Sequence, residues 1–371
     1  MLIIEYLNKV MKDGGYWNAE EVLEFLTSQY GIKVKYNEEY ELYVLNYSQI
    51  DSPKLNPMVM ECRSLVIEFT GSEFLVVSRA FDRFFNYGEG DAKFTNIQLL
   101  EIYEKLDGSL ITVFNHKGTW LYRTKAMIMP IITINGLTAT WNELIEEALN
   151  WKQIEFGSLR PNCSYIFEVT APDNRVVVRY AERGATLLAI RNNDHGTYLD
   201  SVFRQSYASV FGAKLPRQYQ LKTFDDAMQA AKDLPKLEEG YVMYLDGAPV
   251  VKLKNPAYVA AHHLRGEGLN PTRLMDLIIM NEVDEYLSVF PEDKDMFKPY
   301  VKSHSVLMEY AQYLFDISKD IVSQKDFALR VKDTPVSGLL FSMRNNGISL
   351  HDAWKNAPIG QKYKLLAAYI K

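Results

Sequence analysis

The hydrophobic and polar positions of this chain repeat with two different periods, which separate helical from strand-forming stretches. Apolar side chains near the N-terminus recur at helical spacing, at Leu2, Ile3, Tyr6, Leu7 and Val10. A second helix is predicted to start at Asn18, because Glu21 three residues later completes a capping box. Gly31 is a suitable stop for that helix, since glycine commonly follows the last helical residue.

From about residue 32 the period changes to two, which predicts β-strands. We expect strands over residues 32–36, 40–47, 62–69, 74–79, 110–114, 119–125, 165–169, 175–180, 185–191, 241–245 and 249–254. Glycine-containing turns predict three hairpins, at Thr70-Gly71-Ser72, His116-Lys117-Gly118 and Asp246-Gly247-Ala248. A helix over residues 140–151 is expected between strands, because Thr140 and Glu143 form a second capping pair.

Beyond about residue 266 the strand alternation stops. Helical patterns follow over residues 271–288, 297–322, 324–333, 335–345 and 359–371. The sequence therefore predicts an α+β fold in two parts: a domain built on antiparallel sheets over residues 1–265, and an all-helical domain over residues 266–371.

Composition bounds the class of protein. The chain has 371 residues, of which 47% are apolar, so it can bury more than one core. It contains no run of 18 apolar residues, and Glu5 interrupts the apolar N-terminus, so we expect neither a membrane span nor a signal peptide. The two cysteines, Cys62 and Cys163, lie far apart, which fits a reducing compartment and predicts a cytoplasmic location.

The charge balance matters more locally than in total. The chain has a net charge of −6, which is unusual for a protein that binds nucleic acid over its whole surface. Residues 301–371, however, carry ten Lys and Arg against six Asp and Glu, a local charge of +4. This distribution fits a protein that meets nucleic acid through a limited basic region.

A lysine, two carboxylates and two further cations lie on or beside strand-like segments. Lys105 follows an apolar run and precedes Asp107-Gly108. A lysine amine is a nucleophile only when neutral, and burial or nearby cations lower its ordinary pKa of about 10.4. Two lysines spaced two apart on one strand, Lys252 and Lys254, would share a face and supply that field or bind phosphates. We expect Asp107 to orient the segment, and Gly108 to let the backbone approach a ligand closely.

The two carboxylates are Glu168, within a strand, and Glu239, at the start of another. Together they could hold a hydrated Mg²⁺, which prefers oxygen ligands and keeps several waters. Each feature taken alone has an ordinary structural explanation: a turn after a strand, a residue at a strand start, or a solvated strand face. Their order along the chain is what indicates nucleotidyl transfer through a lysine.

The motifs around these residues resemble those of the covalent nucleotidyltransferases, and in particular the ATP-dependent RNA ligases of the bacteriophage tRNA-repair type. Similar segments are ECRS (61–64), SRAFDRFFN (78–86), KLDGSL (105–110), APDNRVVV (171–178), EGYV (239–242), KLKNPAYV (252–259) and LNPTRLMDLII (269–279). Among the departures from the family pattern, Arg83 and Arg123 replace lysines and Leu45 replaces a tyrosine; in the similar segments, the family has a glycine at Ser64 and a proline at Ala80.

The resemblance implies a role for each matched residue. Lys105 would carry AMP, and Lys125 and Tyr258 would serve the later ligation steps. The nucleotide would be bound by Arg63, Arg83, Glu168, Glu239, Lys252 and Lys254. Asp284, in an acidic stretch after the last similar segment, aligns with a family aspartate that binds metal.

The resemblance therefore implies an RNA ligase that uses ATP and Mg²⁺ to join the 5′-phosphate and 3′-hydroxyl of single-stranded RNA ends. A nicked tRNA is the expected substrate, with the helical domain as its specificity element and a separate end-healing kinase-phosphatase as a partner. Two alternatives remain: another lysyl nucleotidyltransferase of the DNA-ligase or capping type, and a non-catalytic RNA-binding relative. The first usually appends a β-barrel where this chain becomes helical. The second would not need intact Lys105, Glu168 and Glu239.

Overall fold

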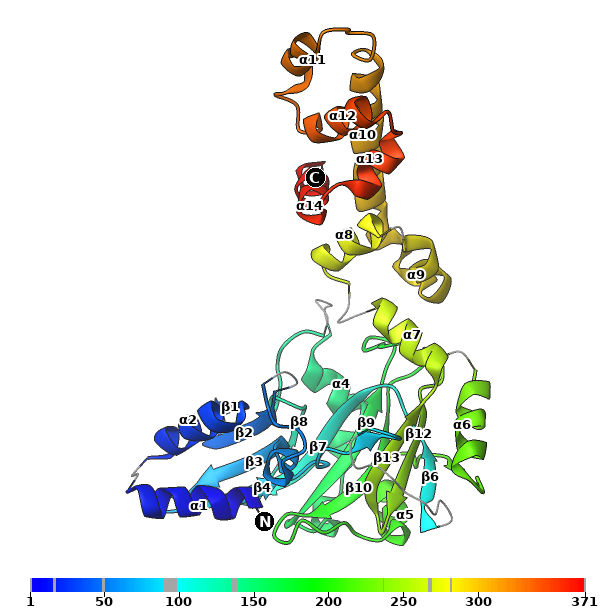
Figure 1. Cartoon of the computed structure of the whole chain (residues 1–371). Coiled ribbons are helices and arrows are strands. Elements are labelled where there is room, and N and C mark those ends of the chain that lie inside the picture. The colour runs from blue at the N-terminus through cyan, green and yellow to red at the C-terminus, as the bar shows by residue number, and fades with distance from the viewer. Residues whose placement is uncertain are drawn as a thin grey trace. The chain divides into compact units, whose positions relative to one another are not determined.

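A computed structural model describes residues 2–15, 18–48, 51–89, 99–134, 139–235, 237–265, 269–280 and 282–369. Its chain divides into two compact units, Met1–Ala260 and Ala261–Lys371, and the division falls inside helix α7 (Pro256–Arg265). Figure 1 shows sheets in the first unit and helices in the second. The mixed helix and sheet content and the helical C-terminal region were both predicted from the pattern of the sequence. Residue 266, where we predicted the helical domain to begin, lies outside the described residues.

The N-terminal sheet of the first unit has the order β1-β2-β3-β4, and all its neighbours are antiparallel. Its strands are β1 (Ile32–Asn37), β2 (Leu42–Tyr47), β3 (Arg63–Phe69) and β4 (Phe74–Ser78). Helices α1 (Leu2–Gly14), α2 (Ala19–Tyr30) and α3 (Pro57–Glu61) pack their apolar faces on this sheet. The Asn18 side chain accepts the Glu21 N–H, and Gly31 ends α2 in the left-handed conformation, as the sequence predicted.

The second sheet has the order β10-β9-β7-β8 and is also antiparallel. It contains β7 (Ser109–His116), β8 (Thr119–Arg123), β9 (Cys163–Thr170) and β10 (Gly184–Asn192). Helices α4 (Trp141–Ala148) and α5 (Ser201–Val210) and the short 3₁₀ helices η2 (Trp151–Gln153) and η3 (Phe156–Ser158) contribute to the core on this sheet. The helix expected over residues 140–151 therefore ends earlier, at Ala148, and continues only as a 3₁₀ turn.

The third sheet has the order β11-β6-β12-β13-β5. Its strands are β5 (Phe85–Asn86), β6 (Glu101–Glu104), β11 (Gln218–Tyr219), β12 (Gly240–Leu245) and β13 (Ala248–Lys254), with helix α6 (Phe224–Asp233) packed against them. The turn between β12 and β13 has φ of 51° at Asp246 and 76° at Gly247, as a tight hairpin requires. The expectation of purely antiparallel sheets needs one correction, because the short β5 pairs with β13 in parallel.

One predicted strand, residues 175–180, does not form. The run of three valines suggested a strand, but the backbone N–H groups of Val177 and Val178 donate to the Asp107 carboxylate, at 2.7 and 2.6 Å. Hydrogen bonds to a side chain therefore replace a sheet ladder at these residues.

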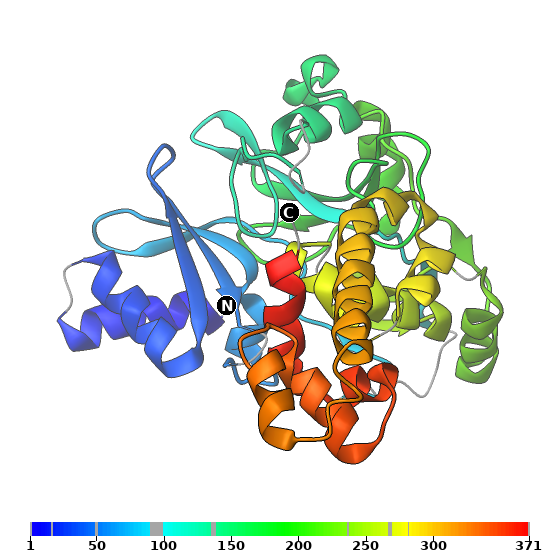
Figure 2. The same cartoon turned by 90° about the horizontal axis from the view of Figure 1, so that it is seen from above.

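The second unit consists of helices over its described residues. They are α8 (Pro271–Ile279), α9 (Val283–Val289), η4 (Pro291–Asp293), α10 (Lys294–Asp316), α11 (Gln324–Val331), α12 (Ser337–Asn346), α13 (Leu350–Asn356) and α14 (Ile359–Tyr369). Figure 2 shows the long α10 beside α14, which it contacts together with α8, α12 and α13. The helix expected over residues 271–288 is divided into α8 and α9, and α13 was not predicted. Among the described residues no helix is both long and apolar enough to cross a membrane.

Candidate active site

Lys105 lies at the end of β6, where pairing with β12 fixes its position. Glu104 and Tyr241 are partners in that antiparallel pair, and the Lys105 N–H donates to the Gly240 carbonyl at 2.8 Å. This register brings the Lys105 ammonium within 2.7 Å of Glu239 Oε2. The lysine side chain is 21% exposed and that of Glu239 only 5%, so the ion pair is shielded from water while its lysine end stays accessible.

Glu239 also binds a second lysine. Its other oxygen, Oε1, lies 3.3 Å from the ammonium of Lys254, which is the register partner of Gly240 across the β12–β13 hairpin. Gly240 permits this approach, because a Cβ at this residue would lie 2.0 Å from the Leu253 carbonyl oxygen. One buried carboxylate thus fixes the candidate nucleophile, Lys105, and one of the two predicted phosphate ligands.

Asp107 anchors the segment that follows Lys105, as we expected from its sequence position. The carboxylate is buried and accepts the two valine N–H groups described above together with the Tyr258 hydroxyl, which donates to Oδ1 at 2.7 Å. Tyr258 is itself buried in α7, and the Lys254 ammonium lies 5.6 Å from the centre of its ring. These contacts join Lys105, Glu239, Lys254, Tyr258 and Asp107 into one connected cluster.

Gly108 is required by the packing of the protein itself. A Cβ there would lie 2.3 Å from the Val169 carbonyl oxygen of β9, a constraint that was not predicted. The Gly108 N–H donates to Glu168 Oε1 at 3.0 Å. Burial raises the pKa of Glu168 to about 7, even though the positive charge of Lys105 opposes that rise.

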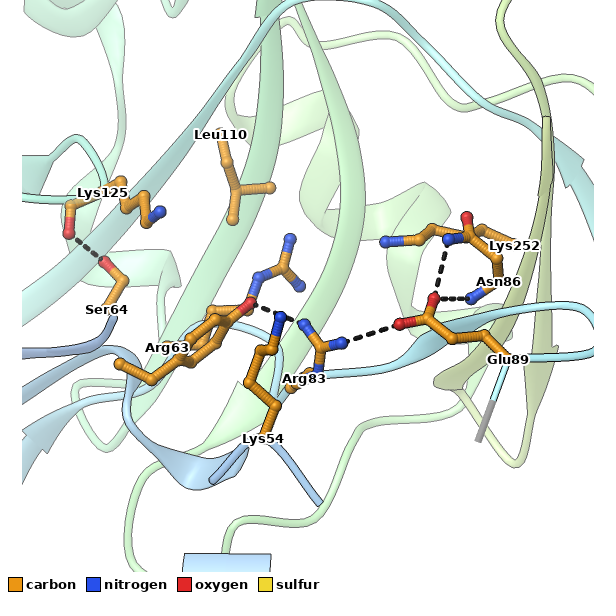
Figure 3. Close-up of a pocket in the computed structure, with 10 residues that line it drawn as sticks. Lys54, Arg63, Ser64, Arg83, Asn86, Glu89, Leu110, Lys125 and Lys252 are labelled. Atoms are coloured by element: carbon orange, nitrogen blue, oxygen red, sulfur yellow. Dashed lines mark hydrogen bonds and ion pairs between the residues drawn. The ribbon is translucent and has the colours of Figure 1, made fainter. Parts of the chain in front are cut away.

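A cavity of about 360 Å³ has Lys252 in its wall, and the positive charges of Lys105 and Lys254 act on that lysine, although none of the cluster residues lines the cavity itself. Figure 3 shows the side chains that line it, which are Tyr47, Lys54, Arg63, Ser64, Arg83, Asn86, Glu89, Leu110, Lys125 and Lys252. Five of these residues are cationic and a single one, Glu89, is a carboxylate. Such a lining favours an anion, and its wall residues come from all three sheets and the loops between them.

Two cations of the cavity stack on one aromatic ring. Arg63 and Lys252 each lie 5.3 Å from the centre of the Phe84 ring, and Arg63 Nη1 donates to the Asp82 carbonyl at 3.4 Å. Burial, together with the neighbouring positive charges of Arg63 and Lys105, lowers the pKa of Lys252 to about 8. An anion in the cavity would relieve this repulsion.

Arg83 also lines the cavity, at a position where the family pattern has a lysine. Its Nη2 donates to Glu89 Oε1 at 2.9 Å, and its guanidinium lies 4.7 Å from the Phe85 ring centre and 5.5 Å from that of Tyr47. A planar guanidinium stacks between rings in a way that an ammonium cannot. The substitution therefore keeps the charge and adds rigidity.

Lys125 is exposed and reaches the cavity from the turn after β8 (Figure 3). Its carbonyl oxygen accepts hydrogen bonds from the Ser64 hydroxyl and the Asn46 amide, both at 2.9 Å. The turn that carries Lys125 is thereby attached to the N-terminal sheet.

Six lining residues had no predicted role: Tyr47, Lys54, Ser64, Asn86, Glu89 and Leu110. Ser64, Asn86 and Leu110 lie within segments similar to the family, whereas Lys54 is in an irregular stretch with no periodic pattern. In Figure 3 the Lys54 side chain points toward Arg83. Only the folding of this loop against the cavity brings its charge to the site.

A known protein family matches the part of the chain that carries this site. The sequence model of a family described as RNA ligase matches residues 61–258, which is more than half of the chain. The chain belongs to this RNA ligase family. The matched segment contains every predicted site residue except Asp284, which lies in α9 of the second unit with an exposed side chain.

The chain has relatives in viruses. It is 28% identical to a protein of Autographa californica nuclear polyhedrosis virus described as a bifunctional polynucleotide kinase/RNA ligase, over 99% of this chain and 53% of that protein. The chain therefore spans about half the length of that relative. It is 25% identical to an RNA ligase of Rhodothermus phage RM378, over 74% of this chain and 78% of the phage protein. A solved archaeal ATP-dependent RNA ligase is similar with a TM-score of 0.47 and 15% identity, over 89% of this chain and 78% of that chain.

The carboxylates near Lys105 allow a simple test of the predicted metal site. Among the described residues, no group of three or more His, Cys, Asp or Glu is placed to hold a metal ion. Glu168 and Glu239, both beside Lys105, supply two carboxylates, and Mg²⁺ is commonly bound by one or two together with waters and substrate phosphates. The donor set fits such a partly hydrated ion.

The raised pKa of Glu168 predicts how pH affects the stability of the protein. Between the unfolded value near 4.3 and the folded value of about 7, the folded chain holds a proton that the unfolded chain has lost. The free energy of unfolding should therefore fall as pH rises through this window. We expect Glu168→Gln to remove on the order of 2 kcal/mol of that fall.

Urea unfolding of both proteins at pH 5 and pH 7 measures the effect, and the difference between them isolates Glu168 from other titrating groups. Glu143→Gln is a matched control, because hydrogen bonds from Thr140 lower the pKa of this exposed carboxyl instead of raising it. Identical pH dependence in wild type and Glu168→Gln would contradict the prediction.

Proposed function

We propose that this member of the RNA ligase family is an ATP-dependent RNA ligase that works through a lysyl-AMP on Lys105. The observation that supports the proposal most directly is the position of Lys105. It lies 2.7 Å from the buried Glu239, beside a cavity lined by five cations and one carboxylate. A reactive amine next to a polyanion site is what nucleotidyl transfer to a lysine requires.

The proposed reaction has three steps. The Lys105 amine, after losing a proton, attacks the α-phosphorus of ATP; the new N–P bond forms while the bond to the bridging oxygen breaks and pyrophosphate leaves. An oxygen of the RNA 5′-phosphate then attacks the same phosphorus, forming the RNA-adenylate and releasing Lys105. Finally the 3′-hydroxyl oxygen attacks the RNA phosphorus, its proton is released, and AMP departs as the strand is sealed.

The residues of the site suit these steps. Glu239 holds Lys105 in place and is the nearest carboxylate to receive its proton, at 2.7 Å. Arg63, Arg83 and Lys252 line the cavity that would bind the phosphates, and Lys254 adds its charge from the other side of Glu239. Glu168 would contact the nucleoside, and Lys125 and Tyr258 would act in the later steps.

A divalent cation, proposed to be Mg²⁺, would neutralise phosphate charge when bound. Glu168 and Glu239 would hold it in the first unit. Asp284, in the second unit, is separately proposed to bind a divalent cation, on the resemblance alone.

The two alternatives differ in the nucleotide they use and in whether they react at all. Mass spectrometry of the purified chain after incubation with ATP or with GTP, each with Mg²⁺, distinguishes them. We expect an increase equal to one AMP with ATP, located on Lys105 by peptide mapping, followed by joining of 5′-phosphorylated RNA. A GMP adduct would indicate a capping-type enzyme, sealing of nicked DNA alone would indicate a DNA ligase, and no adduct would indicate a non-catalytic relative.

The substrate is proposed to be single-stranded RNA ends, and a nicked tRNA in particular. The name of the baculovirus relative combines a polynucleotide kinase with an RNA ligase, which supports an end-healing activity acting before this ligase. We propose that such a kinase acts as a separate partner; residues 1–371 themselves contain no P-loop pattern GxxxxGK[ST].

The basic helices of the second unit are proposed to recognise the tRNA body. Lys355 and Lys364 are exposed, whereas Lys362 donates to the Lys355 carbonyl at 2.9 Å and lies 5.9 Å from the Trp354 ring centre. Lys371 lies outside the described residues. The clearest test therefore changes Lys355, Lys364 and Lys371 to Glu and leaves Lys362 in place.

We expect this triple variant to seal nicked tRNA more slowly and to seal unstructured RNA of equal length as the wild type does. The loss should come with a shallower dependence on salt, by about 1 in the logarithmic slope for each phosphate contact removed. Lys298→Glu is the control, since Lys298 is exposed on α10 of the same unit and pairs with Asp295. Equal loss on both RNAs would remove the tRNA role from these lysines.

A further inference from the structure

Ser64, in β3, has an unusual backbone conformation at the edge of the phosphate cavity. Its φ is +63°, in the left-handed region that glycine adopts freely and other residues avoid. It lies where the register between β2 and β3 shifts, so it is the extra residue of a β-bulge. Its side chain is almost completely buried. A serine at this position must therefore provide something that a glycine would not.

The Ser64 hydroxyl contacts Arg123, in β8 of the second sheet, and Lys125, in the turn that follows β8. It donates to the Lys125 carbonyl oxygen at 2.9 Å and accepts a hydrogen bond from Nη1 of Arg123. The Ser64 N–H donates to the Asn46 side chain at 2.9 Å, and the Asn46 amide donates in turn to the same Lys125 carbonyl. The backbone at Lys125 is thus held by two groups of the N-terminal sheet.

Arg123 is an unusual partner for a hydroxyl. Its side chain is 1% exposed, and burial alone lowers its pKa to about 9. Its hydrogen bonds go to the hydroxyls of Ser64 and Ser78 and to the Thr124 carbonyl, and Nη2 has no partner in the part of the chain that the structure describes. A buried cation without a carboxylate weakens the folded state, so stability does not explain its presence.

These contacts also connect the two sides of the cavity. Ser64 directly follows Arg63, and Arg123 precedes Lys125 by two residues, so the Ser64–Arg123 contact fixes the spacing between the cationic side chains of Arg63 and Lys125. The sequence departs from the family pattern at both Ser64 and Arg123. The structure places these two departures in direct contact.

We propose that Ser64 and Arg123 form a positioning pair that fixes the backbone at Lys125 and so sets where the Lys125 ammonium meets the phosphates in the cavity. The inference rests on the proposed ligase function, since Lys125 matters only if the cavity takes phosphates. Neither Ser64 nor Arg123 needs to touch the reacting atoms. Their effect should pass through Lys125 alone.

A double-mutant cycle tests this route. Ser64→Ala is made in the wild-type chain and in a Lys125→Ala chain. The rates of AMP-adduct formation and of sealing of preadenylated RNA are then measured separately. We expect Ser64→Ala to slow the same step that Lys125→Ala slows, on the order of 10- to 100-fold, as a small displacement of a catalytic group does. In the Lys125→Ala chain it should slow that step by less than about 2-fold.

Ser64→Gly separates positioning from stability. Glycine relieves the left-handed backbone, so this variant should unfold at a higher urea concentration than Ser64→Ala. It also lacks the hydroxyl, so it should be as slow as Ser64→Ala. Arg123→Lys should slow the same step, because one ammonium cannot hold both serine hydroxyls as the guanidinium does. Ser303→Ala, which removes a buried hydroxyl bonded to two carbonyls in the second unit, should leave both rates unchanged.

Three outcomes would overturn the pair. In the first, Ser64→Ala slows the reaction as much in the Lys125→Ala chain as in the wild type. In the second, the rates of the variants fall in proportion to their midpoints of urea unfolding. In the third, Ser64→Ala or Arg123→Lys reacts at the wild-type rate. A wild-type chain that forms no AMP adduct would overturn the proposed function together with this inference. A wild-type chain that forms the adduct and seals RNA while the Ser64 variants do the same would overturn the inference alone.

Discussion

Replacing Lys105 with arginine is expected to abolish covalent attachment of AMP. Arginine keeps the positive charge that pairs with Glu239, so the fold of the site should survive. A guanidinium stays protonated in proteins and has no neutral amine to attack phosphorus. By analogy with removal of other catalytic nucleophiles, the rate of adduct formation with ATP should fall by at least on the order of 10⁴-fold. Intact-mass measurement after incubation with ATP records the result.

A matched control is Lys117→Arg. Lys117 lies in the β7–β8 turn and also pairs with a glutamate, Glu68, but its side chain is 61% exposed and outside the cavity lining. This variant should form the adduct at the wild-type rate. An AMP adduct on the Lys105→Arg chain would show that another residue is the nucleophile, and the proposed mechanism would fail. Sealing of preadenylated RNA by the same variant measures what Lys105 contributes after its own adenylation.

Local signals explain most of what the sequence predicted about the fold. The β12–β13 hairpin was predictable because alternating residues flank Asp246-Gly247, whose positive φ angles a tight turn requires. Strands such as β9 and β10 followed from their own composition. Residues 175–180 have an equally strong local pattern, yet the partner of their N–H groups is the carboxylate of Asp107, some 70 residues earlier. A contact so distant in sequence leaves no trace in the local pattern.

The same limit applies to the helical unit. The helix predicted over residues 271–288 is divided, because α8 ends at Ile279 with Met280 as its C-cap and α9 begins only at Val283. Helix α13 is seven residues long, too short for its periodicity to stand out, and its Ala353 and Trp354 are buried against the rest of the unit. Tertiary burial, rather than intrinsic helix preference, therefore stabilises it.

The candidate site likewise has residues that the sequence predicted and contacts that only the tertiary structure reveals. The residue types and their order along the chain indicated Lys105, Glu168, Glu239, Lys252 and Lys254, because the chemistry of nucleotidyl transfer needs them. The sequence could not show that Glu239 pairs with two of the three lysines, since that depends on the register of β6, β12 and β13. Nor could it show that Lys54 lines the cavity, because an irregular loop brings it there.

Lys252 and Lys254, which the sequence treated as equivalent, have different surroundings. Lys254 pairs with Glu239, whereas Lys252 faces the cavity and stacks on Phe84. Lys252→Ala is therefore expected to weaken phosphate binding with little effect on the position of Lys105. Loss of one preorganised phosphate contact costs about 2.7–4 kcal/mol by analogy with an oxyanion donor. The kcat/KM of adduct formation with ATP should therefore fall about 10²- to 10³-fold.

The lowered pKa of Lys252 adds a second, independent measurement. Its ammonium is present below pH 8 and is lost as pH rises through its pKa of about 8. The KM for ATP in adduct formation should therefore rise above pH 8 in the wild type and stay flatter in Lys252→Arg, whose charge does not titrate.

Lys33→Ala is the matched control for Lys252→Ala, because Lys33 and Lys35 repeat the same two-residue spacing on the exposed face of β1. If Lys252→Ala behaved like Lys33→Ala, Lys252 would be an ordinary strand residue and the phosphates would depend on Arg63, Arg83 and Lys254.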